Sequence, residues 1–315
     1  MNMQFIKDID EGLSKVNKTL PSRYFYDEIG DKLFVEIMNM PEYYLTKAEH
    51  EIFKTQTGAI VNQFNVDKNE QIEIIELGAG DGTKTKEILR YMLKNHYNFS
   101  YLPVDISQHA LSHLEKTLKE EFSTLNVKPQ QGDYFEVLDN LKKSSTKKVV
   151  FFLGSNIGNL EDDEAIRFMK NLSNNLNKGD KLLLGIDIIK PASIVLPAYD
   201  DKQKITARFN LNLLNRINKE LGANFDIDSF KHQPEYTMEE GIAKSFLVSN
   251  KNQQVTITAT KKTYHFKAGE KIHTEISRKY NDVTLKGIIA DSKFKIVTKF
   301  LDSKKYFADY ILEIN

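Results

Sequence analysis

The clearest pattern in the chain is an alternation of short apolar runs with longer amphipathic segments between residues 72 and 190. The apolar runs predict strands, and apolar residues at helical spacing predict helices between them. The predicted strands are 72–77, 99–106, a short one within 126–135, 147–154 and 181–189, and the predicted helices are 83–93, 107–122 and 161–176. Ser107 can cap the second helix, and acidic residues occupy the first turn of the third. Strands that alternate with helices predict a parallel sheet covered by helices on both faces.

The last thirty residues have a different pattern. Residues 294–302 and 306–314 are two apolar runs joined by the short turn Ser-Lys-Lys, which predicts an antiparallel hairpin. A mostly parallel sheet that ends in such a hairpin resembles the class I methyltransferase fold, a Rossmann-like α/β fold whose last strand inserts antiparallel to the others. We therefore expect this α/β fold for residues 49–190 and 279–315.

The two remaining regions, 1–48 and 191–278, contain helical and strand-like patterns of their own. Residues 205–222 carry leucine and isoleucine on one helical face, and "KSFLVSN", "QQVTITAT" and "YHFKAGEKIHTEIS" predict strands within 243–277. Neither region is long enough to form an independent domain. We expect them to pack together as a second, α+β lobe.

Composition narrows the class of protein further. Forty-four basic residues balance forty-four acidic ones, so overall charge does not favour nucleic acid or an anionic membrane surface as a partner. The chain has no cysteine, and its longest apolar runs are far shorter than the roughly 20 residues of a membrane span. The first residues show no signal-peptide pattern. We expect a cytoplasmic protein, a monomer, without a nucleic-acid or membrane partner.

The stretch "ELGAGDGTKT" (76–85) joins the first predicted strand to the first helix and has the form of a nucleotide-binding turn. It misses both common phosphate motifs by one residue, because position 83 is Thr instead of the P-loop glycine and the third glycine of a dinucleotide motif falls at 82. Glu76 and Asp81 would also place two carboxylates near a pyrophosphate. S-adenosylmethionine (SAM) has no phosphate and carries a sulfonium cation, so the turn favours SAM; an ordinary tight turn is the alternative.

Two acidic residues after the next strands strengthen this interpretation. Asp105 ends the second strand, where a carboxylate can accept hydrogen bonds from both ribose hydroxyls. Asp133 follows the third strand, where it could accept from the adenine amino group, and Tyr134 could lie against the ring. Each acid alone could be a solvated loop residue or a helix cap, but three acidic positions after three consecutive strands are harder to explain by chance.

Several stretches outside this turn resemble one family, the SAM-dependent histidine Nα-methyltransferases of ergothioneine biosynthesis. They are "SRYFYDEIGDKLFVEIMNMPEYYLTKAEHEIF" (22–53), "YLPVDIS", "FFLGSNIGNL" (151–160), "AYDD" (198–201), "TARFNLNLLNRINKELGANFD" (206–226) and "GEKIHTEISRKY" (269–280). The resemblance covers nearly the whole chain. It implies methylation of the α-amine of L-histidine to the trimethylated product hercynine, the first step towards ergothioneine, with S-adenosylhomocysteine as by-product and no metal. It also implies that the second lobe binds the amino acid.

The resemblance implies roles for individual residues. The SAM site falls on Gly78, Gly80, Lys84, Asp105, Asp133, Tyr134 and Gly154. The amino-acid site uses Asn159 and Tyr199 for the substrate's amino and carboxylate groups, and Tyr43, Glu275 and Ser277 for the imidazole, with Tyr26 and Phe34 nearby. Asn159, Tyr26 and Tyr43 are the candidate catalytic residues, and either Tyr26 or a water could act as base.

These residue types suit the chemistry. An asparagine can accept from an amine and donate to a carboxylate, while a carboxylate and a hydroxyl at i and i+2 of a strand lie on one face and match the donor and acceptor of an imidazole. From the residues alone, Asn159 could instead be a turn residue, Tyr43 a core aromatic and Glu275 a surface strand residue. His109 and His113 are four apart on a predicted helix but lack a third ligand, so we expect a solvated face there instead of a metal site.

The chain departs from the family pattern at "GIAKSFLVS" (241–249), where Ser245 stands about where the family has a methionine that covers the imidazole. A small polar residue there changes the pocket wall, so a histidine derivative or another amino acid is an alternative substrate. The turn also has Asp81 and Gly82 where the family tends to have small hydroxylated residues. A SAM-binding sensor without catalysis is a further alternative, which retention of Glu275 and Ser277 argues against.

Overall fold

The computed structural model describes residues 3–80, 82–105, 108–132, 137 and 145–315. These residues form two compact units, the first made of Met1–Tyr44 and Lys190–Arg278 and the second of Leu45–Ile189 and Lys279–Asn315. The chain therefore passes between units after Tyr44, Ile189 and Arg278, compared with the expected boundaries after residues 48, 190 and 278.

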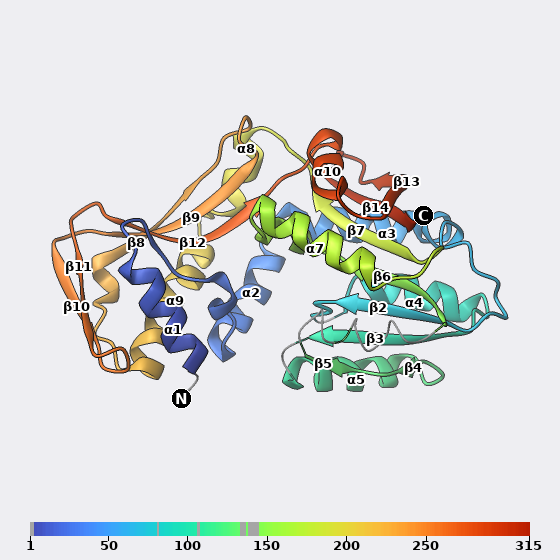
Figure 1. Ribbon diagram of the computed structural model, residues 1–315, viewed down its shortest axis with the longest axis horizontal. Coiled ribbons are helices and arrows are strands. Elements are labelled where there is room, and N and C mark those ends of the chain that lie inside the picture. The colour runs from blue at the N-terminus through green and yellow to red at the C-terminus, as the bar shows by residue number, and fades with distance from the viewer. Residues whose placement is uncertain (1–2, 81, 106–107, 133–136, 138–144) are drawn as a thin grey trace. The chain divides into compact units, whose positions relative to one another are not determined.

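The second unit is built on a largely parallel sheet (Figure 1). Its strands follow the order β13-β14-β7-β6-β2-β3-β4, and β5 also pairs with β3. Their bounds are β2 Ile72–Leu77, β3 Phe99–Asp105, β4 Asn126–Val127, β5 Gln130–Gln131, β6 Lys147–Phe152, β7 Lys181–Asp187, β13 Phe294–Leu301 and β14 Phe307–Ile314. β2, β3, β6 and β7 run parallel, whereas β14 runs antiparallel to both β7 and β13. This is the strand arrangement of a class I methyltransferase, as the sequence predicts.

Helices cover both faces of this sheet, because its strands are apolar on both sides. On β2, Ile75 and Leu77 belong to a core shared with α7 and α10, while Ile72 and Ile74 belong to a core shared with α3, α4 and α5. The helices are α3 Tyr44–Asn62, α4 Thr85–Lys94, α5 Gln108–Glu121, α7 Asp162–Asn174 and α10 Asp282–Ile289, and the single turn η2 spans Asn156–Asn159. The two cores hold the carboxyl ends of the strands in place, where open α/β sheets bind ligands.

The first unit combines helices with a small antiparallel sheet. The sheet has the order β1-β12-β9-β8, and β10 and β11 form a separate hairpin. The strands are β1 Lys18–Thr19, β8 Phe230–Glu235, β9 Ile242–Ser249, β10 Gln253–Ile257, β11 Lys262–Phe266 and β12 Lys271–Arg278. The helices are α1 Met3–Ser14, α2 Glu28–Asn39, α8 Ala192–Val195 and α9 Ile205–Leu221, with short turns η1 Ser22–Phe25, η3 Leu196–Ala198 and η4 Ile227–Ser229. The apolar faces of α1, α2 and α9 share one core with β8, β9, β11 and β12.

The structure departs from the sequence predictions in three places. The third strand of the large sheet is two short pairings, β4 and β5, instead of one strand. The stretch "YHFKAGEKIHTEIS" is two strands, because Gly269 adopts φ 83° in the turn between β11 and β12. Strand β8 and the N-terminal helices were not among the predicted elements.

Candidate functional site

In the glycine turn that follows β2, one glycine packs against a neighbouring helix and another has free space beside it. Gly78, Gly80 and Gly82 have φ values of 72°, 55° and 66°, which favour glycine. A Cβ at Gly82 would lie 2.6 Å from Leu114 Cδ1, so this glycine lets α5 pack against the turn. A Cβ at Gly80 would meet no atom of the described residues within 4 Å, so among these residues the backbone there faces open space. A ligand can therefore approach the main chain of the turn at Gly80.

Glu76, just before the turn, points into the protein and not toward this open space. Its side chain is buried and accepts hydrogen bonds from Thr85 Oγ1 at 2.8 Å and Tyr101 Oη at 2.5 Å. Burial raises the pKa of Glu76 to about 7 despite these two hydrogen bonds. Glu76 is therefore not a surface carboxylate that would repel a phosphate, as the sequence alone predicted. The other carboxylate of that argument, Asp81, lies outside the described residues.

Lys84, at the start of α4, forms an ion pair within the second unit. Its ammonium pairs with the carboxylate of Glu49 from α3, whose other oxygen accepts a hydrogen bond from Gly154 N at 2.8 Å. Burial opposes the charged form of Lys84, but the attraction of Glu49, Glu76 and Asp309 outweighs it and raises the lysine pKa. The structure thus brings together Lys84 and Gly154, two residues of the predicted SAM site that are 70 positions apart in the sequence.

Two further parts of the predicted SAM site can be located only in part. Asp105 is the last residue of β3, is half-buried, and its carbonyl accepts a hydrogen bond from Gly132 N at 3.2 Å. This places it at the carboxyl end of its strand, as expected. Asp133 and Tyr134 lie outside the described residues.

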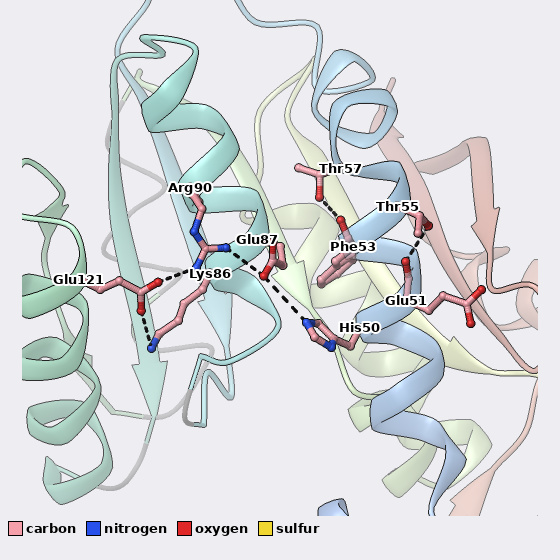
Figure 2. Close-up of polar contacts among 9 residues, drawn as sticks. All are labelled: His50, Glu51, Phe53, Thr55, Thr57, Lys86, Glu87, Arg90 and Glu121. Atoms are coloured by element: carbon pink, nitrogen blue, oxygen red, sulfur yellow. Dashed lines mark hydrogen bonds and ion pairs between the residues drawn. The ribbon is translucent and has the colours of Figure 1, made fainter.

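Charged side chains on the surface tie α4, which begins beside the glycine turn, to the helices on either side of it (Figure 2). Glu121 of α5 pairs with Lys86 at 3.0 Å and with Arg90 at 2.6 Å. Arg90 also pairs with Glu87, which lies 4.0 Å from His50 of α3. Exposed pairs contribute little stability one by one, but this linked set restrains the helix whose first turn carries Lys84.

In the first unit, a β-bulge determines which side chains of β12 face α9. Ile272 pairs with Leu247 of β9, and both belong to the core against α9. The register shifts between His273 and Glu275, so Glu275 pairs directly with Ser245. Residues directly opposite each other on antiparallel strands share a face of the sheet, so Glu275 lies on the same face as Ser245. Ser245 is two residues from Leu247 on β9, so both of these also lie on that face.

The consequence is that Glu275 and Ser277 lie on the α9 side of the sheet together with Ser245. Without this register shift, strict alternation from Ile272 through Thr274 would turn both to the opposite side. Thr274 itself donates to Asn210 Oδ1 of α9 at 2.9 Å. Ser245 is 1% exposed, and its hydroxyl has no hydrogen-bond partner in the part of the chain that the structure describes.

A group of tyrosines adjoins this face of the sheet. Tyr199 packs with Tyr236 and Ala243, and Ala243 is the residue that pairs with Ser277. Tyr43 is partly buried against the same cluster. Tyr199, Tyr43, Ser245, Glu275 and Ser277, all predicted for the amino-acid site, therefore belong to one region of the first unit.

The remaining predicted residues lie elsewhere. The rings of Tyr26 and Phe34, in the first unit, form a T-shaped pair with their centroids 5.6 Å apart, and both rings pack on Phe209 of α9. Tyr26 is 43% exposed. Asn159 is the exposed last residue of η2 in the second unit.

The structure also shows buried ionisable residues that the sequence interpretation missed. Glu49 is fully buried on α3, and Asp309 is fully buried on β14, where neither of its carboxyl oxygens has a hydrogen-bond partner among the described residues. The buried Nε2 of His232 on β8 likewise has no partner within that part of the chain, and burial lowers the pKa of His232 to about 4. The available signal was a charged residue inside an apolar pattern: Glu49 lies between Leu45 and Ile52 on the buried stripe of α3.

No metal site or membrane span emerges from the described part of the chain. Among these residues, no three or more His, Cys, Asp or Glu are grouped so that they could hold a metal ion. His113 is exposed on α5, and the side chain of His109 is not described. No described helix combines the length and hydropathy needed to cross a bilayer.

Comparison with known proteins identifies the family. Residues 5–314 match the family model described as "Histidine-specific methyltransferase, SAM-dependent". The histidine N-alpha-methyltransferase of Mycobacterium tuberculosis is 34% identical over 274 residues, which cover 87% of this chain and 84% of the relative. The corresponding protein of Mycolicibacterium smegmatis is 32% identical, covering 91% and 87%. Ergothioneine biosynthesis protein 1 of Schizosaccharomyces pombe is 29% identical, and its match covers 97% of this chain but 40% of the relative.

These matches confirm the resemblance noted in the sequence, including the class I fold and the use of SAM. The chain is a SAM-dependent methyltransferase and belongs to the histidine-specific methyltransferase family.

Proposed function

We propose that this protein transfers methyl groups from SAM to the α-amino group of L-histidine, three times in succession, and so makes hercynine for ergothioneine biosynthesis. The observation that carries the proposal is the bulge in β12. It turns Glu275 and Ser277 to the side of the sheet that also carries Ser245, beside the tyrosine cluster around Tyr199. A carboxylate and a hydroxyl on one face can pair with both nitrogens of an imidazole.

The second unit suits SAM as the methyl donor. Gly80 leaves its main chain open to a ligand, and Gly78, Lys84, Asp105 and Gly154 surround the carboxyl ends of β2, β3 and β6. Asp133 and Tyr134 complete the proposed set. When bound, SAM supplies an electrophilic methyl group on its sulfonium. The protein's task is then to hold the acceptor amine neutral, oriented and close, because positioning is the main contribution to such a displacement.

The proposed roles of the amino-acid residues follow from their chemistry. Asn159 accepts from the amine and donates to the substrate carboxylate, and the Tyr199 hydroxyl donates to the same carboxylate. Tyr43, Glu275 and Ser277 hold the imidazole, with Phe34 and Tyr26 nearby. Tyr26 or a water takes the proton that the amine loses. Histidine offers the polar pair Glu275 and Ser277 a donor and an acceptor, whereas an apolar amino acid offers neither, and such a difference in hydrogen bonding discriminates between substrates.

A substitution at Glu275 tests this reading directly. We expect Glu275→Ala to weaken L-histidine binding at least about tenfold, because a charge-assisted hydrogen bond is lost, and to leave SAM binding within about twofold. Isothermal titration of each ligand measures both. Glu235→Ala removes a carboxylate from the opposite side of the same sheet, where Glu235 pairs with Lys271, and serves as the matched control. Equal losses for histidine and SAM would contradict the assigned role.

The buried, unpartnered hydroxyl of Ser245 favours a second candidate substrate, a histidine derivative or another amino acid with an extra polar group. Incubating the pure protein with SAM and a panel of amines, with products followed by mass spectrometry, separates the two. Turnover of another amine with histidine untouched would overturn the first proposal. Tight SAM binding without any product would favour a sensor that has lost catalysis.

We further propose that the enzyme is a cytoplasmic monomer that uses no metal, nucleic acid or membrane partner. The balanced charge of the chain and its lack of cysteine support this. Light scattering of the pure protein tests the monomer, and activity that persists after exhaustive chelation tests the metal-free reaction.

A further inference from the structure

Glu49 is a fully buried carboxylate that joins two segments of the second unit. It lies on α3, 0% exposed, with Ile52 and Phe53 next to it on the buried stripe of the helix. One carboxylate oxygen pairs with the Lys84 ammonium and the other accepts from Gly154 N at 2.8 Å. A buried carboxylate in an apolar stripe is costly unless it is paired, so these two contacts determine how Glu49 lies.

Lys84 and Gly154 also lie close to each other, so the three residues form a closed triangle. A Cβ at Gly154 would lie 3.3 Å from Lys84 Nζ, and the glycine has φ 70°. The lysine ammonium therefore occupies space beside the main chain at the end of β6. Glu49 fixes both partners at once: the ammonium by charge, and the Gly154 amide by a hydrogen bond.

Two further carboxyl groups lie around the contact between Glu49 and Lys84. Three carboxyl groups face Lys84: Glu49 from α3, Glu76 from β2 and Asp309 from β14. Asp309 is fully buried, and no group of the described residues hydrogen-bonds to its carboxyl oxygens. Burial, together with the neighbouring Glu49, raises the pKa of Asp309 well above its usual value, whereas Lys84 opposes that rise.

Gly185 of β7 makes this arrangement possible. A Cβ there would collide with Glu49 Oε1 and lie 3.1 Å from Asp309 Oδ1. Both carboxyl groups thus fill the space that the missing side chain leaves. Any larger residue at position 185 would push the Glu49 carboxylate away from Lys84 and Gly154.

We propose that Glu49 is a positioning residue of the SAM site: it holds the Lys84 ammonium and the Gly154 amide in the arrangement that receives the methyl donor. This rests on the proposed assignment of Lys84 and Gly154 to SAM binding. A lysine side chain loses conformational entropy about several rotatable bonds when it is held in one position. Because Glu49 holds Lys84 before SAM binds, SAM binding does not have to supply that free energy. Glu49 acts through its two partners and does not itself touch the donor.

The test uses a substitution that separates the two contacts. Glu49→Gln keeps an oxygen that can accept from Gly154 N but removes the charge opposite Lys84. We expect SAM affinity, measured by titration calorimetry, to fall at least about tenfold, because a charge-assisted contact is lost, while histidine affinity stays within about twofold. Glu51→Gln makes the same change on the same helix, at a partly exposed residue whose carboxylate accepts from Ser303 N at 2.8 Å (Figure 2 labels Glu51), and should leave SAM affinity unchanged.

Substitutions at Asp309 change SAM affinity in a way that a purely structural role for Glu49 does not predict. Asp309→Asn alone should change SAM affinity little, because the Asp309 carboxyl makes no hydrogen bond to Lys84, Gly154 or any other described residue. In the Glu49→Gln variant, Asp309 can ionise and partly replace the lost charge. The double variant Glu49→Gln with Asp309→Asn should therefore bind SAM more weakly than Glu49→Gln.

Gly185→Ala supplies a second route if Glu49→Gln does not fold. It keeps every charge and displaces the Glu49 carboxylate, so it too should weaken SAM binding. SAM affinity of Glu49→Gln within twofold of the parent protein, or an equal loss of SAM and histidine binding, would overturn the proposal. Because SAM binding is measured without turnover, methylation of an amine other than histidine would refute the proposed substrate and leave the Glu49 result standing.

Discussion

Replacing Glu76 by glutamine is expected to stabilise the protein, and to do so more strongly as pH rises. Glu76 is buried beneath the glycine turn, where its pKa is about 7 against an ordinary value of 4.5. Below pH 4.5 the carboxyl is protonated in both the folded and the unfolded chain. As pH rises toward and through 7, the unfolded state ionises freely while the folded state resists, so stability is lost.

The size of the expected stabilisation follows from the shift of the Glu76 pKa from 4.5 to about 7. At about 1.4 kcal/mol per pKa unit, the folded state loses roughly 3 kcal/mol at pH 8.5 but only about 1 kcal/mol at pH 5. Glutamine is neutral and can still accept from Thr85 and pair with Tyr101. The Glu76→Gln variant should recover these amounts, so its gain at pH 8.5 should exceed its gain at pH 5 by about 2 kcal/mol.

Urea unfolding followed by circular dichroism at the two pH values measures the difference. Glu70→Gln, an exposed carboxylate just before the same strand, is the control and should change the free energy of unfolding by less than about 0.5 kcal/mol at either pH. A loss of stability at pH 8.5, or an equal gain at both pH values, would refute the assignment of a buried acid with a raised pKa at the base of the turn.

Two other perturbations probe the packing around the two candidate sites. Gly82→Ala should lower the free energy of unfolding by about 2–4 kcal/mol, because its Cβ would meet Leu114 and its φ is left-handed. Gly80→Ala should lower it only by the left-handed penalty of about 1–2 kcal/mol. Thermal melts compare the two variants, and equal losses would contradict the packing argument. His232 has a pKa lowered to about 4 from 6.5, so the stability it allows is present above pH 6.5 and is lost as pH falls through 4. His232→Gln should therefore move the midpoint of acid unfolding to lower pH, and an unchanged midpoint in an acid titration would show that another group controls it.

Much of the fold could be predicted from the sequence because its strongest patterns are local. The run Ile-Glu-Ile-Ile-Glu-Leu predicts a strand at 72–77, and β2 spans Ile72–Leu77. The hairpin of β13 and β14 follows equally from two apolar runs and a short turn. The short pairings β4 and β5 are set instead by contacts with β3, which a single sequence does not display.

Less of the candidate site could be predicted from the sequence, and the bulge in β12 shows why. Alternation in "KIHTEIS" predicts that Glu275 and Ser277 share a face, but not that this face is the one against α9. That depends on the extra residue Thr274, which breaks the period of two. Glu49 and Lys84 come together only after α3 and the turn pack on the same sheet, so their pairing also needed the structure.

The central claim is that the α-amine of L-histidine is the methyl acceptor. The most direct test incubates the pure enzyme with L-histidine and SAM carrying an isotopically labelled methyl group, and locates the label by fragment-ion mass spectrometry. The account predicts one, two and then three labelled methyl groups, all on the α-nitrogen. Label on an imidazole nitrogen, or unlabelled histidine with SAM intact while another amine is methylated, would contradict it.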